Sequence, residues 1–336
     1  MIRSGDGNPV LAGDIGGTRT RLGFFSMGKQ RPKSGLVRTY LSRDASGVEE
    51  IVERFLSEHP VPFAEACFAV AGPVADGRCR MTNLCWDVSE TGVKRHFGWS
   101  RFRLINDLVA TALAIPLLKS RERVSLNRAG ARSGRPVALV APGTGLGVAF
   151  LVSCAGQSFP VVSEGGHTDF APSCTEQLDL WQFLHKRFGH VSAERVLSGP
   201  GLVNIYSWLK HTKKYPEPRW LKRRIRERGP AEAISEAAIK KADPLCVRSL
   251  EIFVSVFGAV AGNLALTGMA TGGVYLGGGI SPGILPLLKN GLFMKAFTEK
   301  GRFKDILEKI PVKVICNPYT ALLGAAAHAL GYPVSI

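Results

Sequence analysis

The sequence lacks the cysteine patterns that stabilise small secreted domains or bind structural metals. Its cysteines are Cys67, Cys79, Cys85, Cys154, Cys174, Cys246 and Cys316. They form no Cys-x-x-Cys pair and no Cys and His spacing of the zinc type, which argues against a disulfide framework and a structural metal. The first ten residues, MIRSGDGNPV, contain no apolar core of a secretory signal. We therefore expect a cytoplasmic protein in a reducing compartment.

The longest uncharged run, at residues 252–288, is interrupted. This stretch contains no charged residue and is long enough to span a bilayer. Polar residues at positions 263, 267 and 271 break it, and Gly272 and Gly273 separate a helix-like part from a strand-like part. A membrane span is the alternative, but the pattern favours a buried helix followed by a buried strand. We expect no membrane partner.

Acidic residues are few relative to basic ones, with 27 Asp and Glu against 43 Lys and Arg and a net charge of +16. Segment 208–228, WLKHTKKYPEPRWLKRRIRER, contains nine of the basic residues and two Glu. Trp208, Tyr215 and Trp220 interleave with them as in a stacking platform for single-stranded nucleic acid. The Pro-Glu-Pro stretch instead marks a turn between two helices. We interpret the segment as a solvated helical surface with its aromatic side chains turned inward, and expect no specific nucleic-acid partner.

Short apolar strands alternate with helix-like segments along most of the chain, whose 336 residues predict about two domains. Strand-like segments lie at 8–14, 21–26, 65–71, 102–106, 137–153 and 274–276, and helix-like segments lie at 107–118 and 246–268. Two of the strand pairs enclose glycine turns about 125 residues apart. The pattern predicts an α/β protein made of two similar halves that face one cleft.

The first glycine turn has the composition of a phosphate-binding loop. It consists of Gly13, Asp14, Ile15, Gly16, Gly17 and Thr18, which can present backbone N–H groups and a hydroxyl to phosphate oxygens. It matches neither the P-loop nor the dinucleotide fingerprint. A carboxylate ahead of a phosphate would repel it, so Asp14 indicates a Mg²⁺ ion held through water. A plain hairpin turn with Asp as a turn residue is the alternative.

Two further glycine loops repeat this composition. Gly143 and Thr144 lie in the second strand-loop-strand unit, PGTGLG, where glycine permits close approach and threonine supplies a hydroxyl donor. Gly278 and Gly279 follow the strand VYL and suit the flat approach of a nucleotide base or ribose. The three loops together predict a nucleotide site.

The segments LAGDIGGTRTRLGFF and LVAPGTGLGVAFLV resemble the two phosphate loops of the sugar kinase and actin-like ATPase superfamily. LINDLVATALAIPLL, SEGGHTDFAP, HVSAERVLSGPGLVNIY and YLGGGISPGILPLL are similar to the ATP-dependent, zinc-free bacterial glucokinases. These motifs run in order from about residue 10 to 330. The resemblance implies a two-domain actin-like ATPase fold, related to ribonuclease H, with an interdomain cleft, and transfer of the γ-phosphate of MgATP to the 6-hydroxyl of glucose.

The resemblance also implies a general base. Asp107, at the junction of a strand and a helix, aligns with the catalytic aspartate of the family, and Asn106 aligns with its substrate asparagine. Phosphoryl transfer to an alcohol needs a group that accepts the hydroxyl proton. On the residues alone, Asp107 is equally compatible with a helix cap.

Four other residues are candidate sugar ligands. In the Glu164-Gly-Gly-His167 stretch the glycines let the backbone lie near a sugar ring, while Glu164 and His167 exchange hydrogen bonds with hydroxyls. A metal site there is disfavoured because two ligands three residues apart lack further His or Cys partners. Glu194 matches the second sugar-binding glutamate of the family, although an acidic residue early in a helix is the alternative. Asn83 lies where similar proteins line the sugar cleft.

The sequence departs from the family pattern at two loop positions. Arg19 stands where an asparagine is usual, followed by Arg21 at the usual place of an arginine, and Ala141 stands where a glycine is common. Arg19 is compatible with either a direct phosphate contact or an outward orientation.

The resemblance implies a small domain from residues 1–112 plus 318–336, a large domain from 113–317, and a homodimer. Kinases for another hexose or an amino sugar are the alternatives within the enzymes. A sugar-responsive DNA-binding regulator is the alternative outside them, but it requires a helix-turn-helix module, normally ahead of the first phosphate loop.

Overall fold

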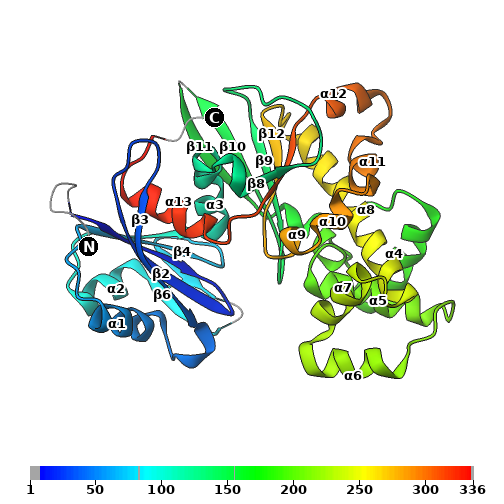
Figure 1. The fold of residues 1–336 in the computed structure, drawn as a ribbon, viewed down its shortest axis with the longest axis horizontal. Helices are drawn as coiled ribbons and strands as arrows, with labels where there is room; N and C mark the ends of the chain where they lie inside the picture. Colours follow the sequence, from blue (N-terminus) through cyan, green and yellow to red (C-terminus); the bar gives the residue numbers. More distant parts are fainter. Residues whose placement is uncertain (1–7, 82–83, 155, 334–336) are drawn as a thin grey trace. The chain divides into compact units, whose positions relative to one another are not determined.

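A computed structural model describes residues 8–81, 84–154 and 156–333 (Figure 1). The chain divides into two compact units. Among the described residues, unit 1 comprises 8–81, 84–119, 154, 156–160 and 317–333, and unit 2 comprises 120–153 and 161–316.

Unit 1 contains a five-stranded mixed sheet. Its strands are β1 (Val10–Ile15), β2 (Arg19–Ser26), β3 (Lys33–Leu41), β4 (Glu65–Val70) and β7 (Phe102–Asn106), in the order β3-β2-β1-β4-β7. β1, β2 and β3 pair antiparallel, whereas β1, β4 and β7 pair parallel. The other elements are a small ribbon of β5 (Arg78–Arg80) and β6 (Asp87–Ser89), and helices α1 (Val48–Glu58), α2 (Glu90–Phe97), α3 (Asp107–Ala114) and α13 (Thr320–Ala329).

The alternation of side chains along the strands gives this sheet two apolar faces. Leu11 and Ile15 of β1 pack in the core that includes α1, where Phe55 is fully buried. The intervening Ala12 belongs to a second core, which α3 and α13 cover from the opposite face (Figure 1). Helices on both faces therefore bury the central strands, as the near-continuous apolar strand sequences predict.

Unit 2 contains a six-stranded sheet built on the same plan. Its strands are β8 (Arg123–Ser125), β9 (Val137–Pro142), β10 (Leu146–Cys154), β11 (Gln157–Ser163), β12 (Gly273–Leu276) and β13 (Val312–Ile315), in the order β11-β10-β9-β12-β13-β8. Here β9 pairs antiparallel with β10 and parallel with β12, which pairs parallel with β13. The same arrangement relates β1 to β2, β4 and β7, so the predicted similarity of the two halves is confirmed.

The helices of unit 2 surround its longest member, α8 (Pro244–Thr267). They are α4 (Thr175–Phe188), α5 (Gly199–His211), α6 (Arg219–Arg228), α7 (Pro230–Ile239), α9 (Ile280–Gly283), α10 (Leu285–Leu288), α11 (Leu292–Thr298) and α12 (Lys304–Glu308). α8 is long and apolar enough to cross a membrane, but 72% of its most apolar window is buried inside the protein. That is the behaviour of a core helix, and Phe253 and Phe257 of α8 are fully buried.

Most of the predicted elements are present with small shifts at their ends. The helix predicted at 107–118 ends as an α-helix at Ala114 and continues as a 3₁₀ turn over Ile115–Leu117. Pro116 explains the change, because proline has no N–H to donate within a helix. The turn predicted between two helices near 216–218 separates α5 from α6.

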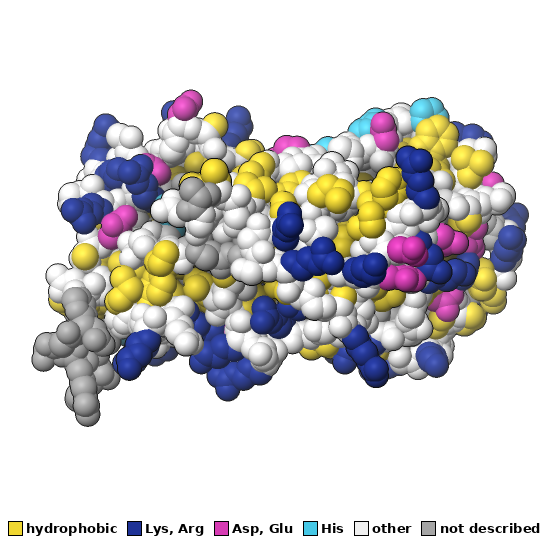
Figure 2. All heavy atoms as spheres, turned by 90° about the horizontal axis from the view of Figure 1, so that it is seen from above, with side chains coloured by type: hydrophobic (Ala, Val, Ile, Leu, Met, Phe, Trp, Pro, Cys, Tyr) yellow, Lys and Arg dark blue, Asp and Glu magenta, His cyan; other side chains and the backbone are white. Residues whose placement is uncertain are grey.

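The basic segment 208–228 differs from the prediction in one respect. Trp208 is buried, with 6% of its surface exposed, whereas Trp220 at the start of α6 is 45% exposed. The expectation that all its aromatic side chains turn inward is therefore wrong for Trp220, because the helix turns Leu221 into the core in its place. On the face drawn in Figure 2, Lys and Arg side chains are scattered among apolar and uncharged ones and do not form one continuous patch.

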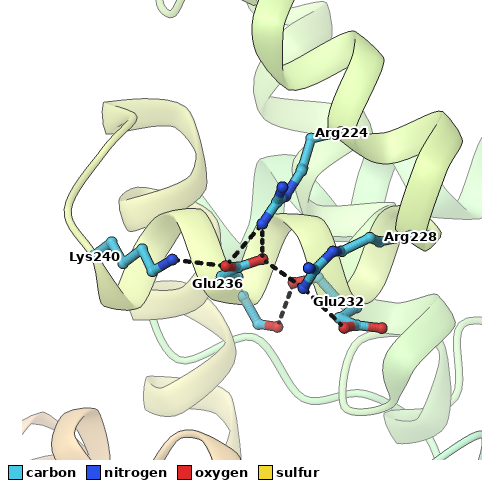
Figure 3. A network of polar contacts seen from close by, with 6 residues as sticks. Arg224, Arg228, Glu232, Glu236 and Lys240 are labelled. Atoms are coloured by element: carbon cyan, nitrogen blue, oxygen red, sulfur yellow. Dashed lines mark hydrogen bonds and ion pairs between the residues drawn. The ribbon is translucent and has the colours of Figure 1, made fainter.

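Carboxylates from α7 neutralise part of this positive charge (Figure 3). Glu236 accepts hydrogen bonds from Arg224 of α6 at 3.0 Å and from Lys240 at 2.7 Å, and pairs with Arg228 at 3.5 Å. The Lys240 and Arg224 hydrogen bonds lower the pKa of the Glu236 carboxyl to about 2. The hydrogen bonds and ion pairs of Glu236 therefore link α7 to α6.

Replacing Glu236 by glutamine should lower the thermal unfolding midpoint at neutral pH. The folded-state pKa lies below the ordinary value, so the stabilisation is complete above about pH 5 and is lost as the pH falls toward 2. The difference in midpoint from the wild type should therefore shrink in acid and in high salt. Glu232→Gln is the control, because Glu232 makes a longer ion pair of 3.7 Å with Arg228. Equal effects of both variants would contradict the assignment.

Candidate active site

The parallel strands of unit 1 bring three candidate segments to one edge of the sheet. Ile15 at the end of β1 pairs with Val70 at the end of β4, which pairs in turn with Asn106 at the end of β7. Gly16, Gly17 and Thr18 of the first glycine turn follow β1 directly, and Asp107 follows β7 directly. Because carboxyl ends of parallel strands meet at one edge, Asp14 and Asp107 lie within electrostatic range of each other.

Asn106, and not Asp107, caps helix α3. Its side-chain oxygen accepts hydrogen bonds from the backbone N–H groups of Leu108 at 2.8 Å and Val109 at 3.4 Å, and its amide nitrogen donates to the carbonyl of Gly72 at 2.9 Å. Asp107 is the first residue of α3. The alternative that Asp107 is the helix cap is therefore wrong.

The environment of Asp107 favours its neutral form. Burial raises the pKa of its carboxyl to about 7, and the negative charge of Asp14 adds to the rise, against smaller opposing hydrogen bonds from backbone N–H groups and Asn106. A carboxyl with this pKa is half-ionised near neutral pH. Such a value suits a group that must accept a proton during a reaction.

Asp14 is held by an arginine on the neighbouring strand. Asp14 and Arg21 are directly opposite each other in the β1 and β2 pair, and Arg21 Nη1 donates to Asp14 Oδ2 at 2.7 Å. Burial raises the pKa of Asp14, while Arg21 opposes the rise. The Arg21 guanidinium also lies 5.7 Å from the centre of the Tyr319 ring, in a cation–π contact. No sequence motif indicated Tyr319, because almost 300 positions of the chain separate it from Arg21.

Asp14 is the carboxylate that the sequence pattern predicts to hold a Mg²⁺ ion. Among residues 8–81, 84–154 and 156–333, no group of three or more His, Cys, Asp and Glu side chains is arranged to hold a metal. Mg²⁺ in nucleotide sites is commonly held by one or two carboxylates, substrate phosphates and waters. A single half-buried carboxylate beside a glycine turn fits that mode, with Arg21 holding Oδ2.

In unit 2, the second glycine loop is closed by main-chain hydrogen bonds. Gly143 N–H donates to the carbonyl of Gly145 at 2.8 Å, and Gly199 N–H at the start of α5 donates to the carbonyl of Gly143 at 2.8 Å. Thr144 between them is exposed. A Cβ on Gly143 would meet no atom within 4 Å, so the loop has open space on that side.

Glu194 lies directly beside this loop. Its Oε2 atom accepts a hydrogen bond from the backbone N–H of Leu146 at 2.9 Å, at the first residue of β10. Glu194 lies in the first turn of a short 3₁₀ helix, Ala193–Arg195, so it is also an acidic residue early in a helical turn. Its side chain is half-buried.

The turn that carries Glu164 and His167 rests on the same residue of β10. A Cβ on Gly166 would lie 2.1 Å from the carbonyl oxygen of Leu146, so only glycine permits this contact. Glu164 and His167 are 71% and 60% exposed, with Glu164 Oε2 and His167 Nε2 4.0 Å apart. Unit 2 therefore brings together Glu164, His167, Glu194 and the second glycine loop.

The third glycine loop packs against the second. Gly278 has a φ of +73°, and a Cβ there would lie 2.3 Å from the carbonyl oxygen of Pro142, which precedes Gly143. Gly278 and Gly279 are exposed. The need for glycine at 278 thus arises from a contact within the protein.

Three further positions remain to be placed. Arg19 begins β2 and is exposed, next to the first glycine turn, where its carbonyl accepts from Gly16 N–H at 3.0 Å. Asn83 lies outside the described residues. Ala141, at the end of β9, is buried in the second sheet.

Two units with one strand order, each carrying a glycine hairpin, and a carboxylate of raised pKa at a strand-to-helix junction define an actin-like ATPase fold of the sugar kinase class. The chain belongs to the glucokinase family, because the family model described as Glucokinase matches residues 11–331. Both the predicted fold and the predicted family are thereby confirmed. Members of this family are ATP-dependent sugar kinases.

Individual relatives agree with this assignment. A glucokinase of Yersinia pestis (strain Pestoides F) is 37% identical over 329 residues, which are 97% of this chain and 98% of that protein. The crystal structure of a glucokinase from an Antarctic psychrotroph is 31% identical and superposes with a TM-score of 0.84, covering 96% of this chain and 99% of that one. A glucokinase from Balamuthia mandrillaris, 20% identical with a TM-score of 0.78 over 96% of this chain and 93% of that one, shares the fold.

Proposed function

We propose that this protein transfers the γ-phosphoryl group of MgATP to the 6-hydroxyl of glucose, giving glucose 6-phosphate and ADP. Membership of the glucokinase family supports the reaction class. The observation that carries the residue assignment is the raised pKa of the Asp107 carboxyl, which is about 7. This carboxyl lies at the sheet edge that also holds the first glycine turn.

Asp107 is the proposed general base. The 6-hydroxyl must lose its proton as its oxygen bonds to phosphorus, and a carboxylate within hydrogen-bond reach can accept that proton. The capping hydrogen bonds of Asn106 hold the start of α3, and with it Asp107, in place. Its amide has a second N–H beyond the one given to Gly72, which we assign to a sugar hydroxyl.

The glycine loops are the proposed nucleotide contacts. Residues 13–18 would bind phosphate oxygens through backbone N–H groups and the Thr18 hydroxyl, and Gly143 and Thr144 would do the same from unit 2. Gly278 and Gly279 would face the base or ribose. Asp14 would hold Mg²⁺ through water, and that ion would neutralise the charge that develops on the transferred phosphoryl group.

Glu164, His167, Glu194 and Asn83 are the proposed remaining sugar ligands. Glu194 can discriminate a hydroxyl, because its half-buried carboxylate would be costly to leave unpaired by the wrong sugar, whereas the exposed Glu164 and His167 would add hydrogen bonds to the sugar. Unit 1 contains Asp107 and unit 2 contains Glu194. We propose that they serve as the small and large domains of the kinase, at 1–112 plus 318–336 and 113–317.

We further propose a homodimer that acts in the cytoplasm as the entry step of glycolysis. Another hexose or an amino sugar is the alternative substrate. A coupled assay of sugar 6-phosphate formation with MgATP, run against glucose, mannose, fructose, glucosamine and N-acetylmannosamine, tests the assignment. We expect glucose to give the highest kcat/KM. A higher value for another sugar would overturn the substrate, and no phosphorylation of any sugar would overturn the function.

The pH dependence of the reaction should report Asp107. The base must be ionised, so kcat/KM should rise with pH through a midpoint near 7. Asp14→Asn removes a negative charge that raises the pKa of Asp107, so the midpoint should move to lower pH even though the remaining activity is smaller. Steady-state kinetics from pH 5.5 to 9 measure both. A midpoint that stays in place would contradict the coupling between the two carboxylates.

A further inference from the structure

A single hydrogen bond joins the proposed sugar site of unit 2 to its proposed phosphate loop. Glu194 Oε2 accepts from the N–H of Leu146, and Leu146 follows the loop residues Gly143, Thr144 and Gly145 directly. The two partners are 48 positions apart in the chain, so this is a tertiary contact and not a feature of one local turn. It places one carboxylate at both sites.

The Glu194 carboxylate also lies close to Gly145 of the loop. A Cβ on Gly145 would lie 2.6 Å from Glu194 Oε2, so any side chain there would displace the carboxylate. The carbonyl of Gly145 accepts from Gly143 N–H at 2.8 Å, which closes the loop on itself. The conformation of the loop and the position of the Glu194 carboxylate therefore depend on each other.

A second link to the sugar side meets the same residue. The carbonyl of Leu146 is in close contact with Gly166, in the turn between Glu164 and His167. The Leu146 side chain is itself buried, with 6% of its surface exposed, so it cannot move without disturbing the core. The two segments proposed to contact the sugar, residues 164–167 and Glu194, therefore both contact Leu146, the first residue after the phosphate loop.

We propose that Glu194 is a positioning residue that couples hexose binding to nucleotide binding through Leu146 and Gly145. This inference rests on the proposed function. A carboxylate has two oxygens, so Oε2 can hold the Leu146 N–H while Oε1 accepts a sugar hydroxyl. A bound sugar restricts the carboxylate, and the restricted carboxylate holds the loop in the conformation that binds phosphate.

The coupling must be reciprocal. If glucose raises the affinity for nucleotide, nucleotide raises the affinity for glucose by the same factor. For one charge-assisted hydrogen bond we expect a factor of about 5 to 10. Within the described part of the chain, the Glu164 side chain pairs with His167 and not with the loop, so Glu164 should contribute nothing to this factor.

The test measures ADP binding by isothermal titration calorimetry with and without saturating glucose, and glucose binding by the same method. We expect glucose to tighten ADP binding in the wild type. Glu194→Ala should weaken glucose binding, weaken ADP binding to the sugar-free protein, and abolish the coupling. The matched control, Glu164→Ala, should weaken glucose binding and leave ADP binding to the sugar-free protein unchanged.

Two further variants keep the test decisive if Glu194→Ala does not fold. Glu194→Gln retains an oxygen that can accept from Leu146 N–H, so sugar-free ADP affinity should be restored while glucose affinity stays weak. Gly145→Ala, in the loop, should weaken glucose binding by displacing Glu194. Circular dichroism establishes that each variant is folded.

The outcomes separate this inference from the proposed function. Loss of glucose affinity in Glu194→Ala with unchanged ADP affinity would make Glu194 a sugar ligand alone and overturn the coupling. Loss of ADP affinity with unchanged glucose affinity would make it a structural support for the loop and also overturn the coupling. A wild-type protein that binds neither glucose nor ADP would overturn the proposed function, and the coupling with it.

Discussion

Asp107→Asn is expected to lower kcat for glucose phosphorylation by about 10² to 10⁴-fold. Asparagine has nearly the shape of aspartate but cannot accept the hydroxyl proton. Helix α3 should form as before, because its cap is Asn106 and not Asp107. Kinetics with saturating glucose and MgATP measure the effect. Asp87→Asn, an equal charge change on an exposed strand of the same unit, is the control and should leave kcat unchanged.

The same variant should be more stable than the wild type at alkaline pH. The folded-state pKa of Asp107 is about 7, above its ordinary 3.8, so the folded protein binds the proton more tightly than the unfolded chain. Its contribution to the free energy of unfolding therefore falls as the pH rises from about 4 to 7. Above pH 7 we expect Asp107→Asn to be more stable by on the order of 2 kcal/mol, since partial exposure reduces the full effect. Urea titrations at pH 4 and pH 8 compare the two proteins.

These two measurements distinguish a base from a structural residue. A residue needed only for folding would lose stability and activity together on substitution. Retained turnover in a folded Asp107→Asn protein would remove the proposed role. Equal stability of wild type and variant at pH 8 would contradict the raised pKa.

Gly324→Ala is expected to destabilise the protein by about 3 kcal/mol or more. Gly324 lies in α13, and a Cβ there would lie 1.7 Å from the carbonyl oxygen of Ala110 in α3. The contact is between two helix backbones, so no flexible side chain can move aside. Helices α3 and α13 would have to separate, which would expose the apolar core shared by Leu322, Ala325 and Ala326.

The activity of Gly324→Ala should fall as well. Ala110 is one helical turn after Asp107, so a shift of α3 moves the proposed base. A displacement of about 1 Å can cost about 10²-fold in rate. Thermal unfolding and kcat measure the two effects. Gly283→Ala is the control, because a Cβ at Gly283 would meet no atom within 4 Å; an equal loss of stability there would contradict the explanation from close packing.

The sequence allowed most of the fold to be predicted. Strands such as Phe102–Asn106 and the long helix at 244–267 could be predicted because their hydrophobic residues follow the periodicity of a strand or a helix. The glycine hairpins and the family motifs indicated the fold class and the family. Asp107 was a candidate because the Asn-Asp pair ends a strand and begins a helix.

Other features had no local signal. The sequence left open whether Asp107 is a helix cap, because both Asn and Asp serve as caps; the structure assigns that function to Asn106, whose amide also reaches Gly72. The exposure of Trp220 depends on which face of α6 meets the core. The glycine at 278 indicated a close approach but not its partner, the carbonyl of Pro142.

Periodicity, turn residues and motifs are properties of neighbouring residues, so the chain alone predicts where its strands, helices and glycine loops lie and to which family it belongs. The partners of the polar groups depend on strand register and on contacts between distant segments. Asp14 meets Arg21 because β1 and β2 pair in one register, and Asp107 joins that edge because β4 lies between β1 and β7. Glu194 meets Leu146 only after unit 2 has folded, because the free energy that selects such contacts comes from burying the whole core.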